Sequence, residues 1–137
     1  MTTNKTDSAV RWFEDLNNAD VGQVGGKNAS LGEMIGTLKS SGIRVPDGFA
    51  TTARAYRDYL QANDLPEKIG RLLDDLDAGK KKLDKVGKSI RRLIGKGQFP
   101  QPTARAIEEA YGELGRRVGD AEVDVAVRSS APAEALP

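Results

Sequence analysis

Hydrophobic positions recur at helical spacing along most of the chain. After the stretch "VGQVGGKN", apolar side chains fall at i, i+3, i+4 and i+7, which predicts a helix over about 28–41. Asn28 or Ser30 can cap its first turn, and Gly42 ends it. The apolar stripe consists of Leu31, Met34, Ile35 and Leu38.

The same spacing predicts four further helices. We expect the last three to form a helical insert at about 64–118. One helix begins after Thr52, one is opened by Asp64 and Pro66, one covers about 82–94, and one runs from about Pro102 to Gly119. Their inner faces are expected to carry Tyr56, Tyr59 and Leu60; Ile69, Leu72, Leu73 and Leu76; Leu83, Val86, Ile90, Leu93 and Ile94; and Ile107, Ala110, Tyr111, Leu114 and Val118.

Three short stretches have the pattern of strands. Residues 122–128 alternate strictly between valine and polar or small side chains, which is typical of a half-buried strand. Residues 48–51 follow the turn "VPDG" and predict a second strand. The stretch 9–14 could be a strand or the start of a helix, and its aromatic residues favour a strand. Few short strands among irregularly placed helices indicate an α+β fold.

Length and composition restrict the classes of function. With 137 residues, the chain is expected to form a single domain over 1–137 with one core. It has neither cysteine nor histidine, which excludes thiolate and imidazole chemistry and a phosphohistidine within these residues. The net charge of +1 gives no overall attraction to nucleic acid or to a membrane. No stretch has the length of a membrane span or a signal peptide, so we expect a cytoplasmic protein.

In the stretch "VGQVGGKNASLGEM", residues 21–34, a pair of glycines and a lysine lies directly before the first predicted helix. A helix N-terminus presents unpaired N–H groups and the positive end of the helix dipole, and glycines there allow phosphate oxygens to approach the backbone. The stretch matches neither a Walker A loop nor the dinucleotide-binding pattern. From these residues alone, a phosphate-binding loop and a plain turn both stay open.

A cluster of positive charge lies between residues 80 and 96, with eight basic residues and one acidic residue. It offers an alternative class of function, a small module that binds nucleic acid or an acidic partner. A solvated outer face explains the same residues, and no aromatic side chain interleaves with them, so nucleic acid is the less expected partner. The basic stripe consists of Lys81, Lys85, Lys88, Arg92 and Lys96.

Three longer stretches of the sequence resemble those of a known family. The stretches "VGGKNASLGEM", "VPDGFATTARAYRDYL" and "VAVRSSA", in this order and spacing, resemble the start of the nucleotide-binding domain of the dikinase family. This family includes phosphoenolpyruvate synthase, pyruvate phosphate dikinase and rifampicin phosphotransferase, and the chain is most similar to the synthase branch. The resemblance extends to "WFEDL" and "FPQPTARAIEEAYGEL" and covers essentially the whole chain.

The resemblance implies an incomplete ATP-grasp-like domain that binds ATP. Lys27 and Arg128 match a lysine and an arginine of the family that contact the nucleotide phosphates, and Gly25 and Gly26 would let the backbone approach them. In the family, ATP gives phosphate to a histidine on a swivelling domain, which carries it to pyruvate in a barrel. A complete synthase converts ATP, pyruvate and water into phosphoenolpyruvate, AMP and phosphate. The resemblance places no catalytic residue and no ligand of the Mg²⁺ ion in this chain.

The family continues well beyond "RSSA", and we therefore expect a fragment of a synthase that is inactive alone. We expect no second domain within 1–137. The other domains of the synthase are expected outside these residues, and a second polypeptide chain could supply them. Pro132 stands where the family has threonine and Ala135 where it has aspartate, so a hydroxyl and a carboxylate are lost beside the expected phosphate site. The ATP-binding part of a rifampicin phosphotransferase remains the alternative, because the choice of acceptor lies in other domains.

Overall fold

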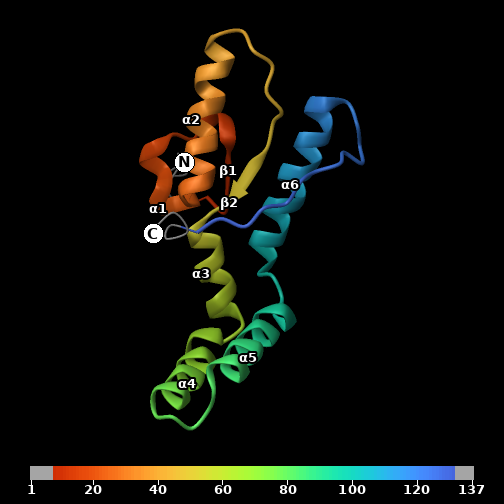
Figure 1. Cartoon of the computed structure of the whole chain (residues 1–137). Helices are drawn as coiled ribbons and strands as arrows, with labels where there is room; N and C mark the ends of the chain where they lie inside the picture. The colour runs from red at the N-terminus through yellow and green to blue at the C-terminus, as the bar shows by residue number, and fades with distance from the viewer. Residues whose placement is uncertain (1–7, 132–137) are drawn as a thin grey trace. The chain divides into compact units, whose positions relative to one another are not determined.

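A computed structural model describes residues 8–131 (Figure 1). Over this range the chain forms six helices and one two-stranded sheet, which confirms the predicted α+β class. It divides into two compact units. The first combines the chain up to Ala55 with the chain from Pro102 onward, and the second is Tyr56–Gln101.

The sheet of the first unit pairs β1 (Val10–Trp12) with β2 (Phe49–Thr51) in antiparallel register. Trp12 lies opposite Phe49, with ring centroids 5.6 Å apart. The predicted strand at 48–51 is confirmed. The strand predicted at 9–14 is confirmed but shorter, because Phe13–Asp15 turn into the 3₁₀ helix η2.

The third predicted strand, at 122–128, is wrong in this structure. In the described part of the chain these residues have no regular structure and do not join the sheet. Val125 and Val127 are 49% and 90% exposed. A strand persists only where a neighbour takes up its backbone hydrogen bonds, and the alternation of side chains cannot supply that neighbour.

Two helices follow β1 and the 3₁₀ helix η3 (Asn18–Asp20). The first, α1 (Val21–Val24), is one turn long, and the second, α2 (Gly26–Ser40), begins two residues before the predicted helix at 28–41. The residues that α2 buries are Ala29, Gly32 and Ile35, whereas Met34 of the predicted stripe is 50% exposed.

The predicted N-caps of this helix, Asn28 and Ser30, are wrong, since its N-cap is Gly25, whereas Gly42 follows its end with a φ of +76° as predicted. The Asn28 side-chain amide instead donates to the Val24 carbonyl at 2.8 Å. The Glu33 carboxylate accepts a hydrogen bond from the Asn18 backbone N–H at 3.0 Å, at the start of η3. These side chains tie the helix to the segment before it rather than to its own first turn.

The core of the first unit is small. Leu16, Val24, Ala29 and Ala50 are buried together, with Phe13 and Val21 packed against them. A buried cation lies beside this cluster. The residue Arg11 is 8% exposed. Its guanidinium donates to the Gln23 side-chain oxygen at 2.6 Å and to the Asp15 carbonyl at 3.0 Å. These hydrogen bonds satisfy a group that would otherwise be costly to bury.

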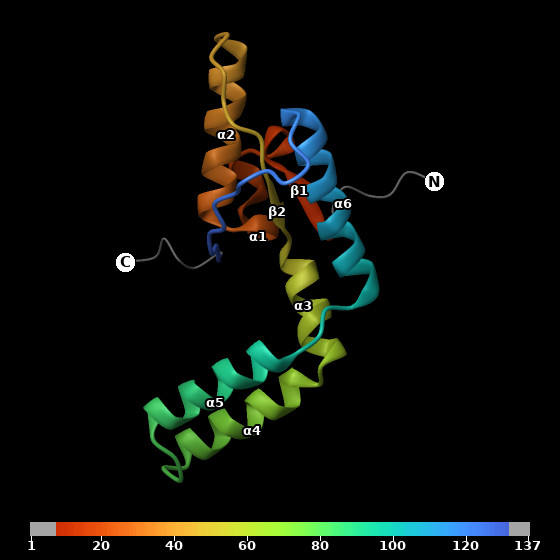
Figure 2. The same ribbon diagram turned by 90° about the vertical axis from the view of Figure 1, so that its right-hand side faces the viewer.

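The second unit is helical. It takes most of α3 (Ala53–Ala62), all of α4 (Leu65–Asp77) and all of α5 (Leu83–Lys96), which confirms three predicted helices. Figure 2 shows α4 and α5 side by side. Thr52 starts α3 as predicted, because its hydroxyl accepts from the Ala55 N–H at 3.2 Å.

Hydrogen bonds join the residues just before α4 to the end of α5 and the residues that follow it. The Tyr59 hydroxyl donates to the Ile94 carbonyl at 2.5 Å. The Asn63 side chain donates to the Gln98 carbonyl at 2.9 Å and accepts from the Gln98 N–H at 2.8 Å. Several expected inner positions are nevertheless exposed in the structure, namely Tyr56, Leu73 and Leu83.

The last helix is α6 (Gln101–Val118), close to its predicted bounds, and Gly119 follows it with a φ of +76°. The helical insert predicted at about 64–118 is therefore wrong in its bounds, because the chain from Pro102 onward belongs to the first unit. It buries Ala110 and Leu114 as expected, but Val118 is 52% exposed. No helix in the described range has both the length and the apolar character to cross a membrane.

Candidate functional site

The turn between α1 and α2 requires glycine at position 25. Gly25 has a φ of +83°, a region that residues with a side chain rarely adopt. A Cβ at this position would collide with the Ser130 hydroxyl and would lie 3.0 Å from the backbone nitrogen of Ala131. Conformation and space therefore both demand glycine where α2 begins.

Lys27 in the first turn of α2 reaches the same distant segment. Its ammonium donates to the Ser129 carbonyl at 3.3 Å, across 102 residues of sequence. The Ser130 hydroxyl donates to the Val24 carbonyl at 3.0 Å. The structure thus brings together the glycine loop and the residues that follow "VAVR", two stretches that the sequence indicated separately.

Arg128 is exposed and forms no hydrogen bond or ion pair within the described residues. It precedes Ser129, so its backbone lies next to the Lys27 contact. Its expected place on a strand is not observed, since 122–128 does not join the sheet. Of the four predicted site residues, the structure therefore joins Gly25 and Lys27 to one segment, places Gly26 between them as the first residue of α2, and leaves the Arg128 side chain exposed.

The helix start supplies donors as well as charge. The first N–H groups of an α-helix have no partner within the helix and point out of its N-terminus. In α2 the earliest intrahelical acceptor is the Gly25 carbonyl, which takes the Ala29 N–H at 3.1 Å. Gly26 begins the helix without a Cβ over these donors. The loop can therefore present backbone N–H groups and an ammonium to an anion.

The described residues contain no cluster of three or more Asp, Glu, His or Cys side chains that could hold a metal ion. The departures at Pro132 and Ala135 lie outside the described residues.

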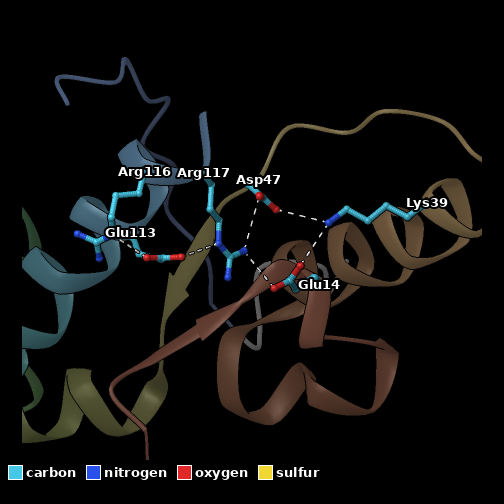
Figure 3. A network of polar contacts seen from close by, with 6 residues as sticks. All are labelled: Glu14, Lys39, Asp47, Glu113, Arg116 and Arg117. Carbon is cyan, nitrogen blue, oxygen red and sulfur yellow. Dashed lines mark hydrogen bonds and ion pairs between the residues drawn. The ribbon is translucent and has the colours of Figure 1, made fainter. Parts of the chain in front are cut away.

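A charged network in the first unit was not foreseen from the sequence (Figure 3). The Arg117 guanidinium contacts Glu14 at 3.0 Å, Asp47 at 3.6 Å and Glu113 at 3.4 Å. It also lies 3.9 Å from the centroid of the Trp12 ring. This one side chain connects the end of α6 to the β1 region and to the segment before β2.

Two further cations complete this network. Lys39 contacts Glu14 at 3.3 Å and Asp47 at 3.5 Å, and Arg116 pairs with Glu113 at 2.9 Å. Hydrogen bonds from Arg116 and then Arg117 hold the pKa of Glu113 below its ordinary value. Burial acts to lower the pKa of Arg117, but its hydrogen bonds to Glu14 and Glu113 outweigh burial and raise it. The charged groups of this network are paired with one another, so we interpret the network as stabilising the fold rather than binding a ligand.

The basic stripe along α5 is exposed at Lys85, Lys88, Arg92 and Lys96. Lys81 pairs with Asp75 at 3.3 Å. This arrangement fits a solvated outer face, and binding of nucleic acid or an acidic partner there remains an untested prediction.

Comparisons with known proteins point to one family. The family described as "Pyruvate phosphate dikinase, AMP/ATP-binding domain" matches residues 21–137. The chain is 51% identical over 132 residues to the phosphoenolpyruvate synthase of Neisseria meningitidis serogroup B, and 49% identical over 138 residues to that of Synechocystis sp.. It is 43% identical over 138 residues to that of Escherichia coli. These alignments cover 96%, 97% and 100% of the chain, which spans 17% of the length of each relative.

Proposed function

The chain belongs to the family of the pyruvate phosphate dikinase AMP/ATP-binding domain, and we propose that it binds the phosphates of ATP where α2 begins. The single observation that carries this proposal is the bond from Lys27 to the Ser129 carbonyl. It sets an ammonium between the glycine loop and the backbone next to Arg128. The fold proposed for these residues is the first part of an ATP-grasp-like domain.

The chemistry of phosphate binding suits these groups. The N–H groups at the helix start and the lysine would bind phosphate oxygens, and the forked guanidinium of Arg128 would neutralise further charge. One contact between unit charges at 4 Å contributes about 4 kcal/mol before desolvation if the effective dielectric constant is about 20. Phosphoryl transfer depends mainly on such positioning and charge neutralisation.

The proposed role in a complete enzyme follows from the relatives, which are named phosphoenolpyruvate synthase. We propose that the chain supplies part of the ATP site of a cytoplasmic synthase that makes phosphoenolpyruvate, AMP and phosphate from ATP, pyruvate and water. The histidine that relays phosphate and the ligands of Mg²⁺ would lie outside these residues, since the chain has no histidine. The chain alone would then be inactive, and the phosphate acceptor of the complete enzyme would be pyruvate rather than rifampicin.

Titration of isotope-labelled protein with magnesium ATP, followed by NMR, tests the site at weak affinity. We expect amide shifts centred on residues 25–28 and 128–130, which adenosine does not reproduce because it lacks phosphate. Lys27→Ala and Arg128→Ala should each weaken binding about tenfold, the usual effect of losing a charged hydrogen bond.

Matched controls are Lys80→Ala and Arg105→Ala, which remove an exposed lysine and an exposed arginine from other places. Both controls should bind as the parent does. Binding that is unchanged in Lys27→Ala and Arg128→Ala would show that the site is wrong. A separate assay for phosphoenolpyruvate tests inactivity, because turnover of pyruvate by the chain alone would refute the need for a histidine elsewhere.

A further inference from the structure

The one-turn helix α1 connects the two segments of the candidate site. Its last carbonyl, that of Val24, accepts the Ser130 hydroxyl at 3.0 Å and the Asn28 side-chain amide at 2.8 Å. The Gly25 N–H that follows donates to the Val21 carbonyl at 2.8 Å. The glycine loop and the segment that contains Ser130 are therefore both joined to this single turn of helix.

This turn is held from outside by a buried cation of β1. A single helical turn is marginal by itself, because fixing it costs more conformational entropy than its own hydrogen bond returns. Arg11 is 8% exposed, and its guanidinium donates to the Gln23 side-chain oxygen, within α1, at 2.6 Å. The same guanidinium lies 3.6 Å from the carboxylate of Asp20, the N-cap of α1. Arg11 therefore contacts α1 at two points.

The remaining contacts of Arg11 fix the guanidinium to the sheet side of the unit. It donates to the Asp15 carbonyl, at the end of η2, at 3.0 Å, and Arg11 pairs with Ala50 in the register of β1 and β2. The Asp20 carboxylate also accepts the Asn17 N–H at 3.0 Å. A guanidinium is planar and carries five donors in fixed directions, so one side chain can serve several partners at once. The position of α1 is thereby referred to the sheet.

We propose that Arg11 is a positioning residue of the candidate site. Through its two contacts with α1, it holds the glycine loop in the orientation that binds phosphate. This inference rests on the proposed function and deepens it, because Arg11 acts on the site through α1. A purely structural role would stabilise the whole first unit without a specific effect on the loop, so the tests compare the loop with the rest of that unit.

The first test measures binding of magnesium ATP in variants that are fully folded under the conditions used. Arg11→Met keeps an unbranched stem and removes every donor. Titration followed by NMR at residues 25–28 should show about tenfold weaker binding than in the parent. Arg117→Met is the matched control, because it removes another arginine of the first unit that has no contact with α1 among those seen in the described residues. It should bind as the parent does.

Gln23→Met tests the same link if Arg11→Met does not fold. It removes the acceptor from α1 at a half-buried position, while Arg11 keeps its contacts with Asp15 and Asp20. Binding should weaken about threefold or more, with helix content unchanged by circular dichroism. Binding by Gln23→Met at the parent's affinity would overturn the inference and leave the ATP site in place. No ATP binding by the parent would overturn the proposed function, and the inference with it.

Amide hydrogen exchange gives a readout that needs no nucleotide. The Gly25 N–H is bonded to the Val21 carbonyl, so its exchange reports whether α1 keeps its turn. In Arg11→Met and Gln23→Met it should exchange about tenfold faster relative to the amide of Ile35, which lies in the middle of α2. A purely structural role would speed both amides by the same factor, and that result would overturn the inference.

Discussion

The contacts that hold the two compact units together span very different numbers of residues along the chain. In the first unit, Arg117 bonds to Glu14 across 103 residues and Ser130 bonds to Val24 across 106 residues. In the helical unit Tyr59–Ile94 and Asn63–Gln98 each span 35 residues. Local contacts cost less loop-closure entropy and form faster. The helical unit therefore rests on more local contacts, whereas the first unit needs segments that precede and follow the helical unit in the sequence.

The units can also be observed separately. Trp12, the single tryptophan, lies in the first unit beneath Arg117. Its fluorescence reports on that unit, while far-ultraviolet circular dichroism reports on the helices of both. Midpoints that coincide for the parent and separate in a variant would show which unit the variant affects. The following changes test this division, from the largest expected effect to the smallest.

Gly32→Ala should destabilise the first unit by about 3 kcal/mol. A Cβ there would collide with the Leu16 side chain and lie 2.7 Å from the Leu16 carbonyl oxygen, so α2 would have to move off its neighbour. Urea unfolding followed by Trp12 fluorescence should show the loss. Gly36→Ala in the same helix is the control, since nothing lies within 4 Å of its Cβ, and it should be neutral or stabilising.

Val86→Ala should destabilise the helical unit by about 2 kcal/mol, because this side chain is 1% exposed within the hairpin. The circular dichroism transition should move to lower urea while the Trp12 transition stays in place. A shift of both transitions by the same amount would show that the units unfold together. Leu83→Ala in the same helix should have little effect, since that side chain is 71% exposed.

Arg117→Met should lower the stability of the first unit by about 1 kcal/mol. It removes the contacts with Glu14 and Asp47 and the cation above Trp12, but it keeps an unbranched stem in place. The Trp12 transition measures the loss. Arg116→Met is the matched control, since its side chain is 69% exposed and pairs only with Glu113 within the described residues; an equal effect would contradict the central role of Arg117 in the network.

Glu113 should give the smallest effect, a modest loss of stability in acid. Hydrogen bonds from Arg116 and Arg117 lower its pKa in the folded state, so the folded form takes up this proton less readily than the unfolded form. Its contribution is therefore present above about pH 4.5 and is lost as the pH falls through the lower folded pKa. Glu113→Gln should reduce stability near neutral pH, and the difference from the parent should shrink in acid.

Glu109→Gln is the control for this pH effect, because Glu109 is exposed on the same helix and has no ion pair in the described range. It should follow the parent at every pH. If the difference between Glu113→Gln and the parent grew in acid instead, the pKa of Glu113 would have to be raised by folding rather than lowered.

The helices were largely predictable because their signals are local. Helical spacing and the turn residues located α3, α4, α5 and α6 within a few residues. The face that each helix buries was less predictable. In α2, for example, close packing against Leu16 selects small residues such as Gly32, while the larger Met34 stays exposed.

The candidate site was predictable only in part. The glycine loop and Lys27 were indicated by the sequence, and the structure adds their contact with Ser129. The network of Arg117 was missed, because no local pattern connects it with Glu14. The strand at 122–128 was predicted wrongly, because alternation describes the side chains and does not provide a partner for the backbone.

The contact between Ser130 and Val24 sets an order of events during protein synthesis. The 106 residues that separate these partners take about 5 to 20 seconds to translate at typical rates. During that interval the glycine loop has been made but its neighbouring segment has not. The residues of the helical hairpin are therefore synthesised before Ser130, so the candidate site can close only after the helical unit has been made.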